Sequence, residues 1–306
     1  MRLAKLLTAA LAVTIAATGC ASKTGTTEPA APTSNSGYPV TVGDVTLAQQ
    51  PKKIVSLSAS ATEMLFAIGA GKQVVAVDDQ SNYPADAPKS ELSGFKPNAE
   101  AIAAKSPDLV VLSFDTNNVV SQLTALKIPV YKALAAKTID DSYTQINNLG
   151  KLTGHVSEAA DVVKRMRDDI AKITKDIKPR AKKLTYYHEL GTDYYSVTSK
   201  TFIGSVYALV GLDNIADPAD ASGAAGGYPQ LTGESIIKAN PDLIFLADTK
   251  CCKQNADTIK ARAGWADLNA VKNKGVVELD DDIASRWGPR IVDLLRKVAD
   301  AVAAIP

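Results

Sequence analysis

Histidine and cysteine are scarce in this chain of 306 residues, which contains only two of the first and three of the second. A site for a bare zinc or manganese ion needs several histidine and carboxylate ligands, so a receptor for such an ion is a weak alternative. Motifs of catalysis are missing too, because the chain has no GxSxG elbow, HExxH pair or phosphate-binding glycine loop. An enzyme is therefore not expected, and neither is a resident metal or cofactor.

Charge of one sign is not in excess, with 34 basic against 33 acidic residues. A protein that binds nucleic acid usually carries a basic excess, so no nucleic acid partner is expected. Beyond the N-terminal region the chain also has no apolar run long enough for a membrane-spanning helix.

The N-terminus has the pattern of an export signal. Arg2 and Lys5 precede an uncharged apolar run that begins at Leu6, and this run is too short to cross a bilayer core of about 30 Å. It ends in Ala-Thr-Gly before Cys20, which is similar to the bacterial lipobox. We expect residues 1–19 to be a lipoprotein signal peptide and acylated Cys20 to anchor the chain on the extracytoplasmic face of the cell membrane. The alternative is an ordinary signal peptide.

Residues 20–37 are mostly Ser, Thr, Pro, Gly and Ala, with almost nothing apolar to bury. Such a composition cannot offset the entropy of ordering, so it predicts a flexible tether.

Cys251 and Cys252 are adjacent. Adjacent cysteines can join only through a small ring, so a structural disulfide is not expected here. The local segment DTKCCKQN offers no convincing further metal ligand. A loop feature is favoured, with a redox or metal role left open.

The first ordered stretch reads as strand, helix and strand. Residues 54–57 are a short β-branched run, cap residues follow at 58–61, and 64–68 form an apolar helical face closed by glycine. Residues 74–77 are the next apolar run. Further strands are expected at 109–113 and at Val130–Tyr131, which together predict a parallel α/β sheet.

An internal repeat organises the rest of the chain. From Gly94 the sequence reads GFKPNAEAIAAKSPDLVVLS, and from Gly227 it reads GYPQLTGESIIKANPDLIFLA. A second match pairs FAIGAGKQVV, which starts at Phe66, with YALVGLDNIA, which starts at Tyr207. Repetition of this kind predicts two similarly built α/β lobes.

A helical pattern without glycine or proline runs from about Val156 to Ile177 between the repeats. It would give roughly 33 Å of helix at 1.5 Å per residue. We expect an N-terminal lobe over 38–153, a bridging helix over 154–179 and a C-terminal lobe over 180–306, with a ligand cleft between the lobes.

These segments resemble a known family. KIVSLSASATEMLFAIGAG, VDDQSNYP, the two Glu-helix–Pro-Asp units and ASRWGPRIVDLL look like the binding proteins of ABC importers for iron siderophores, haem and cobalamin. The resemblance covers nearly everything from Pro51 to Ile305 and is closest to the cobalamin-binding type. It implies two α/β lobes bridged by one long helix, and a monomer that captures a metal chelate, cobalamin foremost. Haem or a ferric siderophore is the alternative ligand.

The resemblance also implies how the chain meets its importer. One acidic side chain per lobe would pair with the permease, and Glu100 and Glu234 occupy those positions in the two repeats. The permease and its ATPase subunits would be the protein partners, although a ligand-sensing lipoprotein that partners a receptor stays open. A plain alternative for each glutamate is a favourable place in the first turn of a helix.

Ligand-binding residues follow from the same resemblance. Phe95 and Tyr228 stand at equivalent places in the repeats, where an aromatic after glycine offers a flat platform for a macrocycle. Further cleft positions, where this sequence departs from the cobalamin-binding type, are Gln80, Glu189, Asp282 and Arg286.

Other side chains near this region carry weaker expectations. His188 is expected to be structural, with a contact to ligand iron or cobalt as the alternative. Tyr228 or Tyr194 could serve as a phenolate ligand to haem iron. His155 is expected at the surface or in a cap, and Trp287 and Arg290 could be structural.

Overall fold

The structure is a computed structural model that describes residues 37–306. The expected signal peptide, Cys20 and the tether up to residue 36 lie outside the described residues. The described part begins with a short antiparallel hairpin of β1 (Val40–Val42) and β2 (Val45–Leu47).

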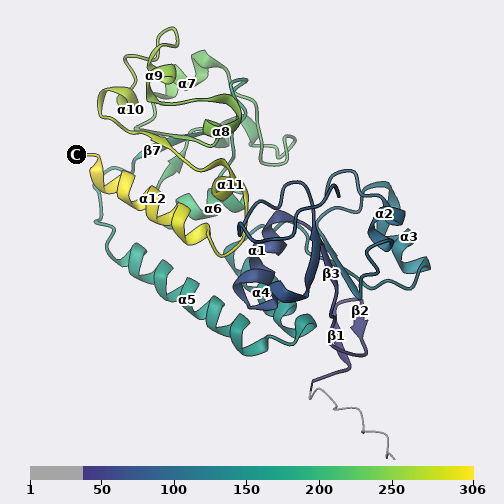
Figure 1. The fold of residues 1–306 in the computed structure, drawn as a ribbon. Coiled ribbons are helices and arrows are strands. Elements are labelled where there is room, and N and C mark those ends of the chain that lie inside the picture. Colours follow the sequence, from purple (N-terminus) through teal and green to yellow (C-terminus); the bar gives the residue numbers. More distant parts are fainter. Residues whose placement is uncertain (1–36) are drawn as a thin grey trace, which may run out of the picture. The chain divides into compact units, whose positions relative to one another are not determined.

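A four-stranded parallel sheet forms the centre of the N-terminal lobe (Figure 1). Its strands, in the order β4-β3-β5-β6, are β3 (Ile54–Leu57), β4 (Val74–Val77), β5 (Leu109–Leu112) and β6 (Val130–Lys132). The first two coincide with the strands predicted from sequence, and the other two differ by one residue at their ends. Its helices are α1 (Ala59–Ala67), α2 (Ala99–Ala103), α3 (Val119–Ala125) and α4 (Ile139–Thr153), with 3-10 turns η1 (Ala70–Gln73) and η2 (Thr116–Asn118).

The C-terminal lobe holds a second four-stranded parallel sheet, in the order β10-β9-β7-β8. The strands are β7 (Thr185–Glu189), β8 (Asp213–Asn214), β9 (Leu243–Leu246) and β10 (Val276–Glu278). The helices are α6 (Phe202–Ala208), α7 (Gly233–Ala239), α8 (Thr249–Cys252), α9 (Ala256–Lys260), α10 (Asn269–Lys272), α11 (Asp281–Ser285) and α12 (Ile291–Ala304), with a 3-10 turn η3 (Asp217–Asp220).

Both sheets have the same topology. When the strands of each lobe are numbered along the chain, the order across either sheet is second, first, third, fourth. The repeat seen in the sequence therefore extends to strand connectivity, and α2–β5 in one lobe corresponds to α7–β9 in the other. The α/β fold with two similar lobes, expected from the repeat, is confirmed.

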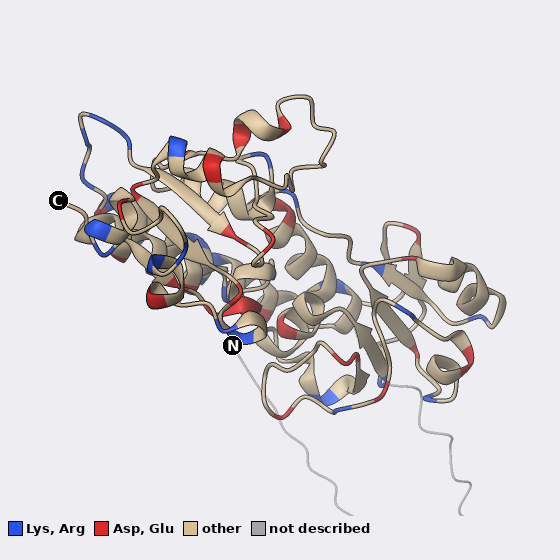
Figure 2. Cartoon of the chain, turned by 90° about the horizontal axis from the view of Figure 1, so that it is seen from above, with Lys and Arg blue, Asp and Glu red and all other residues tan. Residues whose placement is uncertain are grey.

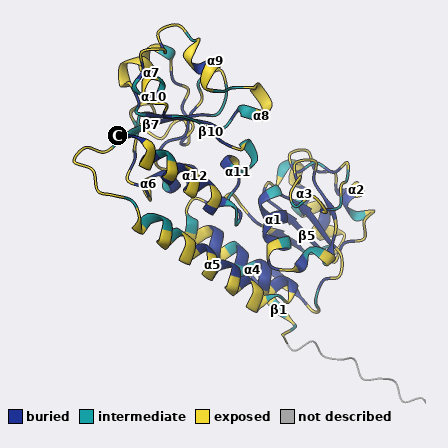
Figure 3. Cartoon of the chain, turned by 60° about the vertical axis from the view of Figure 1, so that its left-hand side comes forward, coloured by how far each residue is buried: buried dark blue, intermediate teal, exposed yellow. Residues whose placement is uncertain are grey.

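The helix predicted between the repeats is α5 (Val156–Lys175). Its buried residues Ala159, Val162, Val163 and Met166 recur at helical spacing and form one apolar face. This helix contacts α4 of the N-terminal lobe and α12 of the C-terminal lobe, as Figure 3 also shows. The helix begins two residues later than the predicted segment 154–179 because Gly154 ends α4 in a left-handed conformation at φ 77°. It ends four residues earlier, at Lys175, ahead of Pro179.

The main hydrophobic core joins the two lobes. It combines buried residues of β3, α1, α4 and α5 with buried residues of β7, α6 and α12. Smaller clusters cover the other face of each sheet, under α2 and α3 in one lobe and around α7 and α9 in the other. Each sheet is thus buried on both faces, which explains the nearly continuous apolar runs of β3, β4, β5 and β9.

Basic and acidic residues are interspersed over both lobes, in keeping with the nearly balanced composition (Figure 2). None of the described helices is both long and apolar enough to span a membrane.

Candidate ligand-binding site

A cavity of about 260 Å³ lies at the carboxyl edge of the N-terminal sheet. Leu57 at the end of β3, Asp78 after β4 and Ser113 after β5 all line it. Carboxyl ends of parallel strands meet at one edge of a sheet, and ligands of open α/β folds bind there. The segment 282–287, which follows the second sheet, closes the other side. We call this cavity the cleft pocket.

Four of the six predicted ligand-binding residues line the cleft pocket, namely Phe95, Gln80, Asp282 and Arg286. They come from segments about 200 residues apart in the chain. The assignment of these residues as ligand contacts stays a prediction, but the fold does bring them together.

One wall of the cleft pocket is a pair of exposed aromatic rings. Phe95 is 60% exposed and Phe114 is 44% exposed, and the two rings stack with their centroids 5.6 Å apart. Leaving such side chains in water forgoes about 1.5–3 kcal/mol each relative to burial, so this wall is suited to an apolar face of a ligand. The sequence analysis does not identify Phe114 as a pocket residue. Its signal is an apolar residue placed directly after the strand end at Ser113.

The floor of the pocket is a network of hydroxyl groups. Ser58 caps α1 by accepting a hydrogen bond from the Ala61 amide at 3.3 Å, and Ser113 donates to the Ser58 hydroxyl at 2.7 Å. Ser81 donates to Asp78 at 2.5 Å. Burial raises the pKa of the Asp78 carboxyl, and this hydrogen bond offsets part of the effect. The serine-rich stretch after β3 thus supplies a polar floor beneath the aromatic wall.

Arg286 forms the charged side of the pocket and is almost fully buried. It donates to Glu63 Oε1 at 2.8 Å, to the Gln80 carbonyl at 2.9 Å and to Asp282 Oδ1 at 2.9 Å. Glu63, on α1, also accepts from Arg290 Nε at 2.9 Å. This ion network ties the chain segment before α12 to the first helix of the N-terminal lobe. Glu63 was not singled out from the sequence, and nothing in its helical pattern marks it as buried.

Asp282 connects the pocket to two further segments. Its Oδ2 atom accepts hydrogen bonds from Asn82 Nδ2 at 3.0 Å and from Lys250 Nζ at 2.7 Å. Burial raises the pKa of Asp282, but these hydrogen bonds and the charges of Lys250 and Arg286 outweigh it and leave the pKa lowered. Asp282 is therefore charged at the rim of the pocket.

Tyr228 lies on the C-terminal lobe and is not among the residues that line the cleft pocket. Its ring is 48% exposed. The loop before it is held by Asp220, which accepts hydrogen bonds from the amides of Ala225 and Gly227. Gly227 has φ 92°, and a Cβ atom there would come within 2.6 Å of Thr201. Glycine before the aromatic is thus required by the turn that presents Tyr228 to solvent.

Glu189 does not occupy the open position that was expected. It ends β7, is fully buried, and receives two hydrogen bonds of 2.6 Å from the Arg262 guanidinium. Both carboxylate oxygens are thus engaged inside the C-terminal lobe. The local sequence of β7, TYYHE, does not indicate this arrangement, because the partner Arg262 comes from a loop more than 70 residues later.

His188 and Tyr194 are also internal. His188 is fully buried and its Nδ1 atom is 2.7 Å from the Tyr207 hydroxyl. Burial lowers the pKa of His188 to about 3, so the ring is neutral. Tyr194 stacks on Trp265 with centroids 5.8 Å apart. The structural role expected for His188 fits this burial, whereas the alternative, a contact of its ring with ligand metal, does not. His155 stands at the N-terminal end of α5, with Nδ1 3.0 Å from the Thr153 carbonyl oxygen.

The expectation that Cys251 and Cys252 form no structural disulfide is wrong in one respect, because the two sulfurs are joined. The small ring that adjacency imposes is accommodated where α8 ends, just before Lys253 at φ 58°. Among the described residues no group of three or more metal-ligating side chains is placed to hold a metal ion.

The two predicted docking residues occupy equivalent places. Glu100 is the second residue of α2 after the Asn98 cap, and Glu234 is the second residue of α7 after the Thr232 cap. Both side chains are exposed. The repeat thus presents one carboxylate from each lobe in the same local structure.

Known proteins resemble the chain over most of its length. Residues 54–283 match the model of the family described as periplasmic binding protein. The chain is 31% identical to an uncharacterised ABC transporter substrate-binding lipoprotein of Bacillus subtilis, over 87% of this chain and 86% of that protein. It is also 31% identical to a cobalamin-binding protein of Halobacterium salinarum, over 98% and 84%.

Among solved structures, a possible iron-binding periplasmic solute-binding protein from Staphylococcus epidermidis superposes with a TM-score of 0.71 at 28% identity, over 83% of this chain and 99% of that one. The Bacillus subtilis and Halobacterium relatives likewise match along most of the chain. The chain therefore belongs to the periplasmic binding protein family, and it is a binding protein rather than an enzyme.

Proposed function

We propose that this chain is the extracytoplasmic substrate-binding lipoprotein of an ABC importer and that it captures a metal chelate, cobalamin foremost, for the permease. The observation that carries the proposal is the exposed Phe95–Phe114 stack beside the charged Asp282–Arg286 pair in the cleft pocket. This arrangement suits a ligand with a broad apolar face and polar groups along its edge.

The size of the cleft pocket agrees with a ligand that is only partly enclosed. Pockets that enclose drug-sized ligands measure about 300–1,000 Å³, and the cleft pocket measures about 260 Å³. A corrinoid or another wide chelate would therefore insert one edge and rest its face on the two phenylalanines. Tyr228, exposed on the other lobe, is proposed to contact the opposite side.

The residues that line the pocket favour a chelate whose metal is already coordinated. Among the described lining residues there is no histidine, tyrosine, cysteine or methionine, which are the side chains that ligate haem iron. Cobalamin and ferric siderophores need no ligand from the protein. The Halobacterium relative is named a cobalamin-binding protein, and this supports cobalamin as the first candidate.

A ferric chelate is the second candidate. The Staphylococcus epidermidis structure, which is described as possibly iron-binding, has the same fold at 28% identity. The Arg286 guanidinium already donates to Glu63, Gln80 and Asp282, so it would act on the carboxylate or catecholate edge of such a ligand through its positive charge.

Anchoring and delivery complete the proposal. Acylation of Cys20 would hold the chain at the membrane, and the Bacillus subtilis relative is itself described as a lipoprotein. Glu100 and Glu234 would each pair with a basic side chain of the permease, one per lobe, as the pseudo-two-fold repeat allows. The folded part from residue 38 on is proposed to act as a monomer, with lobes over 38–153 and 180–306.

Direct binding measurements test the ligand assignment. We expect calorimetry to show submicromolar binding of cyanocobalamin, at about −8 kcal/mol or better, with haemin and a ferric hydroxamate as competing probes. Replacing both Phe95 and Phe114 by alanine should weaken the binding by about 2–4 kcal/mol, because aromatic anchors dominate such contacts.

A matched control is Leu126→Ala, which removes an apolar side chain that is 54% exposed and does not line the pocket. It should leave the affinity unchanged. Binding of none of the three probes, or equal affinity in the phenylalanine double variant, would refute the assignment.

A further inference from the structure

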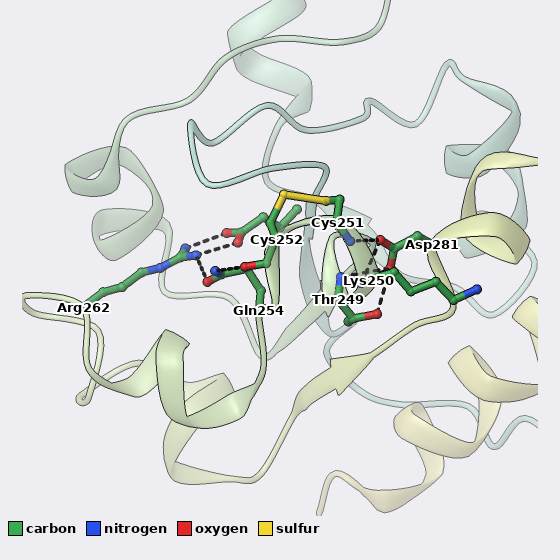
Figure 4. Close-up of a disulfide and its surroundings, with 8 residues drawn as sticks. Thr249, Lys250, Cys251, Cys252, Gln254, Arg262 and Asp281 are labelled. Atoms are coloured by element: carbon green, nitrogen blue, oxygen red, sulfur yellow. Dashed lines mark hydrogen bonds and ion pairs between the residues drawn. A yellow bond between two sulfur atoms is a disulfide. The ribbon is translucent and has the colours of Figure 1, made fainter. Parts of the chain in front are cut away.

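The disulfide between Cys251 and Cys252 lies on the surface of the C-terminal lobe, on the short helix α8 (Figure 4). Both cysteines are exposed, so a thiolate in solution can reach their sulfur atoms. The described residues contain no other cysteine. This bond therefore has no neighbouring thiol with which to exchange.

A bond between adjacent residues cannot hold distant parts of the chain together. A disulfide restrains the unfolded chain through the loop that it closes, and the effect grows with loop length. Here the loop is a single peptide unit, so this contribution is minimal. What the bond does fix is the local backbone, because the two side chains and the peptide between them form one small ring.

On one side this ring adjoins the rim of the cleft pocket. The Asp281 carboxylate accepts hydrogen bonds from the amides of Thr249, Lys250 and Cys251, and the Cys251 contact is 3.1 Å long (Figure 4). The Lys250 ammonium donates to the carboxylate of Asp282 at 2.7 Å. Asp282 in turn binds Arg286. Two contacts, Lys250–Asp282 and Asp282–Arg286, thus connect the residue next to Cys251 with the charged side of the pocket.

On the other side the ring adjoins a buried cluster. The Cys252 carbonyl accepts a hydrogen bond from Gln254 Nε2 at 3.0 Å, and Gln254 Oε1 accepts one from Arg262 at 2.8 Å. Figure 4 shows this chain of contacts. The Arg262 guanidinium lies 4.7 Å from the centre of the Trp265 ring. The fluorescence of Trp265 can therefore report whether the Cys251–Cys252 disulfide is closed or open.

We propose that Cys251–Cys252 is a reversible thiol–disulfide exchange site, opened by dithiol reductants outside the cytoplasm, and that its opening loosens the Asp282 side of the cleft pocket. The redox site stands on its own geometry, and only its effect on ligand affinity rests on the proposed function.

The exchange conserves atoms and electrons. A thiolate of the reductant attacks one cysteine sulfur, the bond between the cysteines breaks, and the electron pair leaves on the other sulfur, which takes up a proton. The second thiolate of the reductant then attacks the sulfur of the mixed disulfide that belongs to the reductant. This closes the disulfide of the reductant and releases the first cysteine. Two electrons and two protons reach the protein, and the reductant becomes a disulfide.

Opening the ring frees the peptide between the cysteines to rotate. The Cys251 amide, which donates to Asp281, and the Cys252 carbonyl, which accepts from Gln254, lie just outside the ring on its two sides. By fixing the backbone torsions between these two groups the ring sets their relative orientation, and opening the ring releases it. Each hydrogen bond must overcome more conformational freedom than before. The hydrogen bonds that Asp281 accepts from the amides of residues 249–251 therefore weaken, and the Lys250–Asp282 ion pair weakens with them.

Native alkylation tests the first half of the proposal. The full chain is treated with millimolar dithiothreitol without denaturant and then with iodoacetamide, and the peptide that contains both cysteines is analysed by mass spectrometry. We expect both sulfurs to be alkylated after reduction and neither before it. Cys251→Ser is the control, because its remaining thiol should react without any reductant. Alkylation that requires denaturant would overturn the proposal.

Coupling to the pocket is tested by fluorescence and by affinity. In a Trp287→Phe variant Trp265 is the single remaining tryptophan, and its emission should change on reduction. The affinity for cyanocobalamin or haemin should fall about three-fold or more on reduction. A Cys251→Ser, Cys252→Ser double variant should match the reduced protein and ignore the reductant.

Identical emission in the oxidised and reduced forms would refute the coupling. So would an unchanged affinity for whichever probe binds. Failure of both probes to bind would count against the proposed function instead, while alkylation and Trp265 emission would still decide whether the redox site exists.

Discussion

At the scale of single residues, the two lobes differ in how their buried carboxylates are neutralised. Glu63 in the N-terminal lobe is matched by two guanidinium groups. In the C-terminal lobe, Glu189 and Asp248 are both fully buried, and Arg262 forms an ion pair with Glu189. The Asp248 side chain has no hydrogen-bond donor among the described residues. A proton shared between the two carboxyl groups resolves this arrangement, because one acid can then donate to the other.

The stability of the protein should therefore depend on the protonation of Asp248. Burial, and then the charge of Glu189 and a hydrogen bond with it, raise the pKa of Asp248 to about 7. The Tyr187 hydroxyl and the Arg262 guanidinium also face this group. An unfolded Asp titrates near pH 3.9, so the folded chain holds a proton that the unfolded chain releases. The free energy of unfolding should thus fall as the pH rises from about 4 to about 7.

Asp248→Asn removes this titration and keeps a hydrogen-bond donor toward Glu189. We expect its free energy of unfolding to lack the fall between about pH 4 and pH 7, and to exceed that of the wild type at about pH 8 by on the order of 1–3 kcal/mol. Urea unfolding across this pH range measures both. A variant less stable than the wild type at high pH would show that Asp248 is needed as a carboxylate.

At the scale of elements, the turn between α4 and α5 sets how the long helix leaves the N-terminal lobe. Gly150 on α4 is buried, and a Cβ atom there would lie 2.4 Å from Ala159 Cβ and 2.9 Å from the His155 carbonyl oxygen. The two helices thus approach closely because Gly150 has no side chain. A capping box formed by Thr138 and Asp141 fixes the other end of α4.

Gly150→Ala should destabilise the protein even though alanine is the better helix former by about 1 kcal/mol. The added methyl group has no room between α4 and α5, and overpacking typically costs about 1–3 kcal/mol. Lys151→Ala, at the exposed next position of the same helix, is the matched control and should change the free energy of unfolding by less than about 0.5 kcal/mol. Thermal or urea unfolding measures both variants. Equal losses of stability would contradict the close approach of α4 and α5.

At the scale of the whole described molecule, the segment before α12 is bound to the N-terminal lobe through polar contacts. Besides the Glu63 network, Ser142 donates to the Trp287 carbonyl at 2.5 Å and the Trp287 indole donates to Gln145 at 3.1 Å. These polar contacts join the lobes in addition to α5 and to the shared hydrophobic core. Large movements of one lobe against the other would have to break buried hydrogen bonds.

Removing Glu63 should therefore cost far more than removing a surface ion pair. Glu63→Ala leaves Arg290 without its anionic partner and Arg286 with Asp282 alone, and breaking a buried pair costs about 3–5 kcal/mol. Asp168→Ala breaks an exposed pair with Lys164 on α5 and should cost less than about 1 kcal/mol. Urea unfolding of both variants makes the comparison. Similar losses would mean that the Glu63 network does not stabilise the lobe contact.

Docking on a permease also belongs to this scale, because it requires both lobes. Glu100→Ala combined with Glu234→Ala should leave affinity for cyanocobalamin unchanged and abolish uptake into cells, since charge pairs at interfaces contribute about 1.5–7 kcal/mol. Glu158→Ala removes another exposed glutamate from the first turn of a helix and should leave uptake intact. Normal uptake by the double variant, expressed at the usual level, would refute the docking role.

The sequence by itself determined the local elements and their repetition. Runs of β-branched residues predicted the strands from β3 to β6, the cap at Ser58 located the start of α1, and the paired Glu-helix–Pro-Asp segments revealed two similar lobes. These features depend on neighbours within a few residues or on one copy of the repeat matching the other. Both are visible in a linear chain.

Only the tertiary structure decided which polar residues are buried and which distant segments meet. Glu189 and Arg262 are 73 residues apart, and Glu63 and Arg290 are 227 apart. The stack of Phe95 on Phe114 likewise depends on how two loops leave β4 and β5, which lie on either side of β3 in the sheet. Such contacts follow from strand order and lobe packing, which the local pattern of apolar residues does not specify. The same pattern fits a buried ion pair and an open cleft residue at the end of a strand, and only the packing around that strand separates the two.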